Sequence, residues 1–453
     1  MTNHESPVVV IGGGLSGLLS AALLSRRGVP VIVVERAPAP GGRAATRERH
    51  GFSFNLGPHA LYRRGILKRT LNDLGVEVTG GIPTGSGGYA IAGGRVHTLP
   101  IGLSSLITTG AIGLAGKVEF ARLYAKLPAV KSYRLQRTTL ASWLDANFHD
   151  TAARQLLEMT VRVTTFTNDP QHQSAGAAIE QLQLGLQGSV LYVDGGWQTI
   201  VDGVRRVAIG AGARIVTGAS ATALERCDAR TVDAVRLADG SVLRASAVIL
   251  TGTPSDVEPL AGLSGLVAGL PPPVRVATLD VALRSLPKPR HTVAFGVDMP
   301  LYFSVHSALA RLAPDGGAVI HATKYLRPDE TADRETEREL EALMTLMQPG
   351  WRDRLEFKQF LPNLIVTHAE ATAEIGGVGG RPSVRLAAFD NVAIAGDWVG
   401  PRGQLSDACA ASAADAVSYL RPHATSIPRP TSVPGRGTEV GSGTEVAGTV
   451  LAR

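Results

Sequence analysis

The chain has 453 residues, 44% of them hydrophobic, and a formal net charge of +6, so it is long enough to bury the cores of two domains. Its 45 basic residues are dispersed, which argues against a nucleic-acid partner, and its two cysteines, Cys227 and Cys409, are too few to indicate a disulfide framework or a metal site. No charged and then apolar leader precedes the first predicted strand, so we expect a cytoplasmic protein.

The first predicted element is a short uncharged strand that breaks into glycines and resumes as a helix. Gly12 permits a tight turn, Gly14 lets backbone amides approach a phosphate, and Gly17 lets the helix pack closely on the strand. Leu15 and Ser16 open the helix, whose positive end would face the phosphates. With 52 glycines in the chain, the spacing alone could arise by chance.

The second predicted strand covers residues 29–34 and ends in Glu35, about twenty residues beyond the glycines. A carboxylate at this place can accept both hydroxyls of an adenosine ribose, so Glu35 and the adjoining Arg36 are candidate contacts for a dinucleotide. The stiff loop that follows ends in Gly42 and Arg43, which could approach phosphate oxygens. The alternatives are a βαβ unit without a ligand and a surface turn with a solvated arginine.

The middle of the chain alternates between two kinds of pattern. Residues 61–189 have helical patterning with mixed charge and predict an inserted domain, whereas residues 212–250 predict a β-meander. For a second excursion over 261–369, the expected elements are strands near 274–283, 301–305 and 318–321 and a helix over 329–347 with Leu340, Leu343 and Leu346 or Met347 on its buried face.

An uncharged segment, residues 99–116, is interrupted by a proline and glycines and is short for a membrane span. We predict a pair of short helices that line an apolar pocket, and a peripheral contact with a membrane surface is the alternative. Residues 421–453 are rich in Pro, Gly, Ser and Thr, so they are predicted to form a disordered tail.

The end of the chain repeats the pattern of its beginning. An apolar strand at 391–395 leads into Gly396 and Asp397, and an alanine-rich helix over 404–419 follows. If the ligand is a flavin, Asp397 can accept a ribityl hydroxyl, while the helix N-terminus can stabilise negative charge on the reduced ring. The alternative is that Asp397 is an ordinary helix cap.

Taken together, the motifs resemble those of the FAD-dependent oxidoreductases of the phytoene desaturase, protoporphyrinogen oxidase and amine oxidase superfamily. They occur in the order Gly12-x-Gly14-x-x-Gly17, Glu35, Gly41-Gly42-Arg43, Leu56-Gly57-Pro58-His59, Gly195-Gly196-Trp197 and Gly396-Asp397-Trp398. The resemblance implies an α/β fold: a Rossmann-like FAD-binding domain, a doubly wound sheet with an inserted β-meander, from residues 1–60, 190–260 and 370–420. It also implies a discontinuous α+β substrate-binding domain from residues 61–189 and 261–369.

The resemblance further implies a site for non-covalent FAD. In it the glycines hold the pyrophosphate, Glu35 the adenosine ribose, and Arg43 the phosphates or ribityl chain. The remaining implied contacts are Gly57, Pro58 and His59 near the isoalloxazine ring, Gly396, Asp397, Gln404 and Leu405 around the ribityl and pyrimidine end, and Ala221 at the adenine.

The implied chemistry depends on a residue that is missing. Amine oxidases of this superfamily commonly place a lysine, through water, at flavin N5, and the corresponding strand, residues 273–283, has none. Lys324 could substitute, although an exposed position at a strand end is the simpler expectation. The resemblance therefore favours hydride transfer from a hydrophobic small-molecule substrate to the flavin. His59 is the candidate acid or base, and the alternative is that it only packs there.

Two other kinds of protein stay open. One is a flavoenzyme without net oxidation, such as an isomerase. The other is a binding protein that has lost its flavin, as the prenyl-GTPase escort proteins have. The sequence assigns no oligomeric state.

Overall fold

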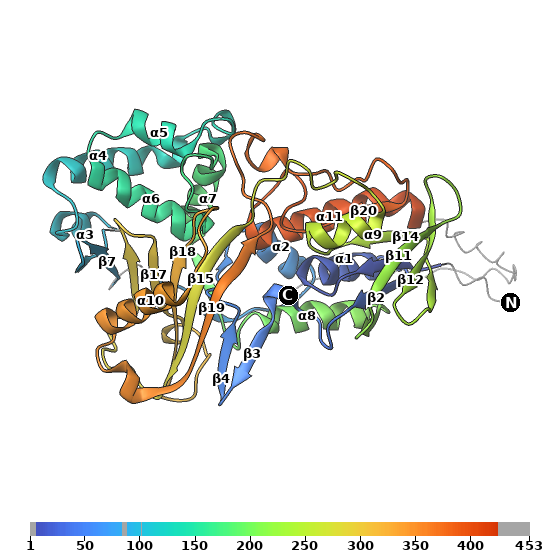
Figure 1. The fold of residues 1–453 in the computed structure, drawn as a ribbon, viewed down its shortest axis with the longest axis horizontal. Coiled ribbons are helices and arrows are strands. Elements are labelled where there is room, and N and C mark those ends of the chain that lie inside the picture. Colours follow the sequence, from blue (N-terminus) through green and yellow to red (C-terminus); the bar gives the residue numbers. More distant parts are fainter. Residues whose placement is uncertain (1–5, 84–87, 101, 425–453) are drawn as a thin grey trace, which may run out of the picture.

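The computed structural model describes residues 6–83, 88–100 and 102–424, which form two lobes lying side by side (Figure 1). The first lobe is built on a five-stranded parallel sheet in the order β10-β2-β1-β14-β20. Its strands are β1 (Val8–Ile11), β2 (Val31–Glu35), β10 (Arg214–Thr217), β14 (Ala247–Leu250) and β20 (Val392–Ile394). The central strands are covered on both faces, which is why they are continuous aliphatic runs rather than alternating ones.

Two different layers cover this parallel sheet. One face packs against α1 (Leu15–Ser25), α8 (Gln198–Gly210) and α11 (Leu405–Ala424), and the alanines of α11 allow it to approach α1 closely. The other face packs against the meander β11 (Ala221–Arg226), β12 (Val232–Leu237) and β13 (Val242–Arg244) and against α9 (Pro254–Ala261). The predicted α/β fold with an inserted β-meander is confirmed.

The second lobe contains a seven-stranded, largely antiparallel sheet in the order β19-β15-β18-β17-β16-β7-β8. Its strands are β7 (Tyr89–Ala92), β8 (Arg95–Thr98), β15 (Val274–Leu283), β16 (Val293–Gly296), β17 (Leu301–Val305), β18 (Ala318–Tyr325) and β19 (Leu355–Thr367). One face packs against α10 (Arg334–Met347) through an aliphatic core. Because successive side chains of a strand point to opposite faces, alternate residues of β15, β17 and β18 form the other face.

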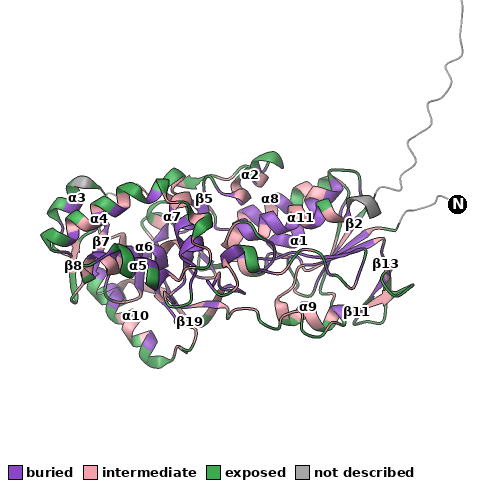
Figure 2. Ribbon diagram, turned by 90° about the horizontal axis from the view of Figure 1, so that it is seen from above, coloured by how far each residue is buried: buried purple, intermediate pink, exposed green. Residues whose placement is uncertain are grey.

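A group of helices completes the second lobe: α3 (Leu103–Thr108), α4 (Leu114–Lys126), α5 (Leu140–Asn147), α6 (Thr151–Thr165) and α7 (Ala175–Gly188). They share a core of their own, and α3 and α4 lie at the end farthest from the parallel sheet (Figures 1 and 2). Smaller elements are β3 (Thr46–Arg49), β4 (Phe52–Asn55), β5 (Leu61–Tyr62), α2 (Ile66–Asp73), β6 (Gly80–Gly81) and β9 (Val190–Val193). In the described ranges, no helix is both long and apolar enough to cross a membrane.

Several expectations about the elements need correction. The helical pattern expected over 61–189 missed the hairpin β7–β8, in which Gly93 and Gly94 both have positive φ, as a two-residue hairpin turn requires. Strands β16 and β19 were also missed. In α10, Leu346 is 39% exposed and does not belong to the buried face, whereas Leu340, Leu343 and Met347 do.

The predicted domain boundaries stay a prediction, although every strand of the parallel sheet falls inside the segments assigned to the FAD-binding domain. The tail was predicted to begin at residue 421, but α11 continues to Ala424. The rest of that prediction, residues 425–453, lies outside the described residues.

Candidate functional site

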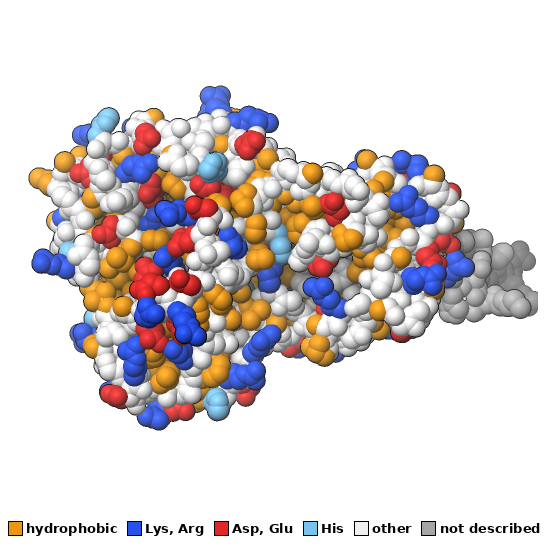
Figure 3. All heavy atoms as spheres, in the orientation of Figure 1, with side chains coloured by type: hydrophobic (Ala, Val, Ile, Leu, Met, Phe, Trp, Pro, Cys, Tyr) orange, Lys and Arg blue, Asp and Glu red, His pale blue; other side chains and the backbone are white. Residues whose placement is uncertain are grey.

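A cavity of about 950 Å³ lies between the glycine turn of the first lobe and strand β19 of the second. Its volume is near the top of the range of about 300–1,000 Å³ that is usual for small-molecule and cofactor pockets. The predicted site residues that line it are Gly12, Gly14, Leu15, Ser16, Glu35, Arg36, Gly42, Arg43, Pro58, His59, Ala221, Gly396, Asp397 and Leu405. On the face shown in Figure 3, hydrophobic side chains gather where the two lobes meet.

Three predicted contacts do not line this cavity. A Cβ on Gly17 would lie 1.9 Å from the Gly12 carbonyl oxygen, so Gly17 allows close packing, as predicted, rather than contact with a ligand. Gly57 has a φ of +76° and turns the chain toward Pro58. Gln404 is placed differently from the prediction, because its Nε2 donates to the Ala177 carbonyl oxygen at 2.8 Å.

The glycine turn presents open backbone to the cavity. Gly12 has a φ of +109°, which only glycine adopts readily, and a Cβ added at Gly14 would meet no atom within 4 Å. The Gly41 amide donates to the Gly13 carbonyl at 2.9 Å, so the loop after β2 packs against the turn. The N-terminus of α1 therefore faces free space of a kind that suits a phosphate group.

Glu35 is held in place beside this turn. The backbone amides of Gly13 and Ala37 donate to its two carboxylate oxygens at 2.6 and 2.7 Å. Arg36, which was predicted as a ligand contact, lines the cavity and forms an ion pair at 3.1 Å with Asp256, another lining residue. Each carboxylate oxygen of Glu35 retains a lone pair, and the residue lines the cavity, so it can still accept hydroxyl groups.

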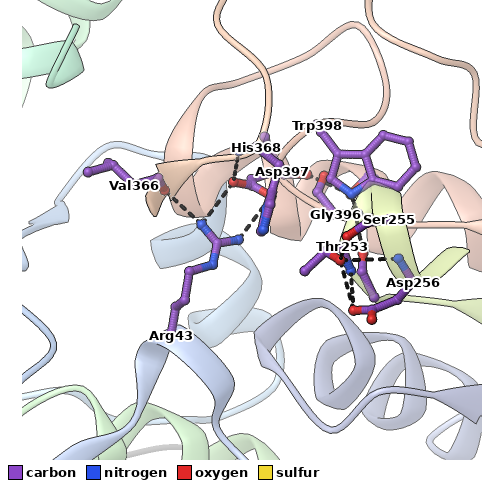
Figure 4. Close-up of polar contacts among 12 residues, drawn as sticks. Arg43, Thr253, Ser255, Asp256, Val366, His368, Gly396, Asp397 and Trp398 are labelled. Atoms are coloured by element: carbon purple, nitrogen blue, oxygen red, sulfur yellow. Dashed lines mark hydrogen bonds and ion pairs between the residues drawn. The ribbon is translucent and has the colours of Figure 1, made fainter. Parts of the chain in front are cut away.

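A second part of the wall is centred on Asp397, at the carboxyl end of β20 (Figure 4). Arg43 donates to it from two nitrogens, at 2.9 and 3.0 Å, and also donates to the Val366 carbonyl. His368 donates from its backbone amide and lies with Nδ1 3.0 Å from Asp397 Oδ1. Burial alone would raise the pKa of Asp397, but the charge of Arg43 and the contacts from His368 lower it far below the usual range.

Arg381 fixes the loop that carries Asp397. Its side chain is 7% exposed and donates to the carbonyl oxygens of Asp397, Gly400 and Gly403 at 2.7–2.9 Å. Burial lowers the pKa of Arg381 to about 10, although the charge of Asp397 opposes this shift. The guanidinium stays charged at neutral pH and holds the backbone between β20 and α11.

The part of the cavity nearest the second lobe is mostly apolar. Its wall includes Phe166, Val276, Leu364 and Trp197. His59 also lines it, with Nδ1–H donating to the Gly57 carbonyl at 3.1 Å and its ring edge against Trp197. Because burial lowers the pKa of His59 to about 4, the imidazole is neutral at pH 7 and its Nε2 can accept a proton.

A buried polar cluster lies on the sheet face that α10 does not cover. His321 Nδ1 is 2.6 Å from Asp280 Oδ1, and both side chains are fully buried. The ring of His306 lies edge-on to His321 and stacks on Tyr192 at 4.1 Å. Burial lowers the pKa of His306 well below its usual value, with the charges of neighbouring histidines acting in the same direction. The cluster forms part of the buried interior of the second lobe.

Two predictions about reactive side chains can be compared with the structure. None of the described residues that line the cavity is a lysine. Lys324 is not exposed as expected: its side chain is 17% exposed and pairs with Glu330 and Glu339. Cys409 does line the cavity, and burial raises the pKa of its thiol to about 11, so it is protonated at neutral pH.

Sequence reasoning missed His368 and Arg381. His368 belongs to no motif, and only the tertiary contact with Asp397 reveals it. Arg381 follows the glycine-rich stretch 376–380, a signal that could have drawn attention to it. Residues 99–116 were predicted to form a pair of short helices that line an apolar pocket; they form α3 and the start of α4, and none of their described residues lines this cavity.

The fold is that of a two-lobed α/β protein whose cavity, between the lobes, has room for a dinucleotide. A model of the family described as flavin containing amine oxidoreductase matches residues 15–278, more than half of the chain, and the chain belongs to this family. The superfamily predicted from the motifs is thereby confirmed, and the family implies a flavin cofactor. The open backbone at Gly14, with Glu35 and Asp397 at the wall, is a donor and acceptor set that fits FAD.

Individual relatives match over shorter stretches. The chain is 46% identical over 77 residues to a limonene dehydrogenase polypeptide from Castellaniella defragrans, covering 17% of this chain and 14% of that protein. It is 38% identical over 112 residues to human protoporphyrinogen oxidase, covering 22% and 24%. The solved structure of an oxidoreductase from Methanosarcina mazei superimposes with a TM-score of 0.70 at 19% identity, covering 92% and 100%. These curated relatives are thus matched over about a quarter of their length or less, and the structural likeness shows the fold.

Proposed function

We propose that this protein is an FAD-dependent dehydrogenase or desaturase that removes a hydride from a hydrophobic organic molecule, with FAD held non-covalently. One observation carries the proposal: a single cavity has phosphate- and ribose-binding groups at one end and an apolar wall of Phe166, Val276 and Leu364 at the other. When bound, FAD supplies the hydride acceptor, its N5 atom. A cytoplasmic location and the absence of a nucleic-acid partner stay predictions.

The residues of the chain would act mainly by binding and orientation. Open backbone at Gly14 and the helix end of α1 would hold the pyrophosphate, and Glu35 the adenosine ribose. Arg43 and Asp397 would hold the ribityl end. The apolar wall excludes water and positions a C–H bond of the substrate for transfer. Where the oxidation also releases a proton, neutral His59 would accept it at Nε2.

Cys409 bears on how the flavin is held. A covalent bond to this sulfur needs the thiolate as nucleophile, and the raised pKa of about 11 keeps the thiol protonated. This favours the non-covalent form.

The first experiment is the visible absorption spectrum of the purified full-length protein, before and after denaturation. Flavin bands that pass into the supernatant support non-covalent FAD. Anaerobic bleaching by apolar substrates, with an oxidised product, then supports dehydrogenation over isomerisation. A colourless protein that FAD does not reconstitute overturns the proposal and favours a binding protein. Bleaching by amines alone favours an amine oxidase, which would have to work without a pocket lysine.

A further inference from the structure

The positive charge of this chain is concentrated in one segment. Residues 78–144 contain seven basic residues, Arg95, Lys117, Arg122, Lys126, Lys131, Arg134 and Arg137, and a single acidic residue, Glu119. Their net charge of +6 equals that of the whole chain, so the rest of the molecule is balanced. Basic residues are about as dense here as in the rest of the chain, so the excess arises because acidic residues are scarce in this segment.

The same segment carries the largest exposed apolar side chains of the second lobe. Leu114 is 80% exposed, Ile107 66% and Val118 45%. Lys117 Nζ donates to the Ile107 carbonyl at 2.7 Å, which joins the end of α3 to the first turn of α4 and brings these three side chains to one end of the molecule. Clustered exposure of this kind usually marks a contact surface.

Helix α4 is amphipathic with respect to the lobe's own core. Gly116, Phe120 and Leu123 are buried against the other helices. On the outward side, Leu114 and Val118 occupy the first turns, and exposed Arg122 and Lys126 continue the same stripe at four-residue spacing. The exposed face thus changes from apolar to basic along the helix.

Glu119, the acidic residue of this segment, is already engaged. Both carboxylate oxygens of Glu119 accept backbone amides, from His149 and Asp150, at 2.8 Å. Tyr133 and Arg134 are also exposed, but they lie beside Ile375 and Gly376 and are not part of the α3–α4 end. An apolar tip beside exposed basic side chains is the pattern of a surface that lies in the headgroup region of a bilayer.

We propose that the α3–α4 end of the molecule docks on the surface of an anionic phospholipid bilayer. Ile107, Leu114 and Val118 enter the boundary between headgroups and acyl chains, while Arg122 and Lys126 face the anionic headgroups. Burial of apolar area and attraction to lipid charge act together, and each basic residue contributes about fivefold in partitioning. Figure 2 shows this end exposed and remote from the parallel sheet. The proposal does not depend on the flavin chemistry.

The test uses the full-length protein and sedimentation with vesicles of phosphatidylcholine, with and without about 30–40% of anionic phosphatidylglycerol. We expect binding to the anionic vesicles, weakened at high salt. Leu114→Glu and the double change Arg122→Glu with Lys126→Glu should each weaken it at least about tenfold. Ile209→Glu, on α8 and 46% exposed in the native protein, is the matched control and should bind normally.

Three results would overturn the proposal. The first is no binding to anionic vesicles, and the second is a loss of vesicle binding in Ile209→Glu as large as that in Leu114→Glu. The third is a dimer in sedimentation equilibrium that Leu114→Glu dissociates, which would assign the surface to a second copy of the chain. Far-UV circular dichroism of each variant distinguishes a lost contact from a lost fold. Since binding is read without any substrate, a failed oxidoreductase assay would leave this result unaffected.

Discussion

Arg43 and Asp397 lie 354 residues apart in the chain and form a two-pronged ion pair at the cavity wall, with nitrogen–oxygen distances of 3.0 and 2.9 Å. The pair joins the loop after β2 to the end of β20, two segments of one sheet that meet only in the folded protein. Asp397 is almost completely buried, whereas Arg43 keeps 37% of its side chain exposed. The arginine is therefore the member that can adjust to a ligand.

Asp397→Asn should weaken both flavin binding and stability. The change leaves Arg43 without its charge partner and removes an acceptor from His368. Breaking a buried ion pair costs about 3–5 kcal/mol, and the partial exposure of Arg43 reduces this to roughly 2–3 kcal/mol. Thermal unfolding and FAD titration measure the two effects. Asp415→Asn breaks the more exposed pair with Arg402 and should change stability by less than about 1 kcal/mol. Equal effects of the two changes would contradict this account.

Two glycines of the same turn should respond differently to alanine. Gly14 has a φ of −73° and open space where a Cβ would go, so Gly14→Ala should fold normally but bind FAD at least about tenfold more weakly. Gly17→Ala would place its Cβ 1.9 Å from the Gly12 oxygen and should cost roughly 1–3 kcal/mol or prevent folding. Unfolding of the flavin-free proteins and FAD titration separate the roles. Undiminished FAD binding in a folded Gly14→Ala would exclude a phosphate at this turn.

His59→Ala should slow reduction of the flavin by substrate about 100-fold while leaving FAD bound, if His59 accepts the proton. Burial lowers the pKa of His59 to about 4. The ionisation of His59 should therefore leave the native rate of flavin reduction unchanged from pH 5.5 to 8 and lower it only near pH 4. Anaerobic stopped-flow absorbance measures the rate. His149→Ala changes an exposed histidine and serves as the control. An unchanged single-turnover rate in His59→Ala would assign His59 to packing.

Glu370 should make the stability of the protein fall as pH rises. Its side chain is 2% exposed, and burial together with the neighbouring Asp169 raises its pKa from 4.5 to about 8. The folded state therefore holds an extra proton between these values, so the stabilisation is complete below pH 4.5 and is lost as pH rises through 8. Glu370→Gln removes this dependence. Its free energy of unfolding, relative to that of the native protein, should therefore rise by roughly 2–4 kcal/mol as the pH is raised from 5 to 8.

Denaturant unfolding at several pH values measures that difference. Glu374→Gln changes an exposed carboxylate four residues away and should run parallel to the native protein across the same range. If the free energy of unfolding of Glu370→Gln also varies with pH in parallel with that of the native protein, Glu370 is charged in the folded state.

Local patterns predicted the elements that matter most for the cofactor. The strand before Gly12, the helix after it and the end of β2 at Glu35 lie where the sequence placed them, because buried parallel strands are continuous apolar runs and glycine turns have few alternatives. The hairpin β7–β8 was missed although the pair Gly93–Gly94 is a turn signal in the sequence, because the helical pattern around it dominated the interpretation.

The order of residues was enough to establish the fold class, the flavin-dependent superfamily and fourteen of the residues that line the cavity, since these depend on motifs that act through their own backbone. Only tertiary packing brings His368 and Arg381 to Asp397 and directs Gln404 to Ala177. It also places α3 and α4 at the far end of the second lobe. Side-chain pairing across hundreds of residues depends on how the lobes pack, and neither periodicity nor residue spacing carries that information.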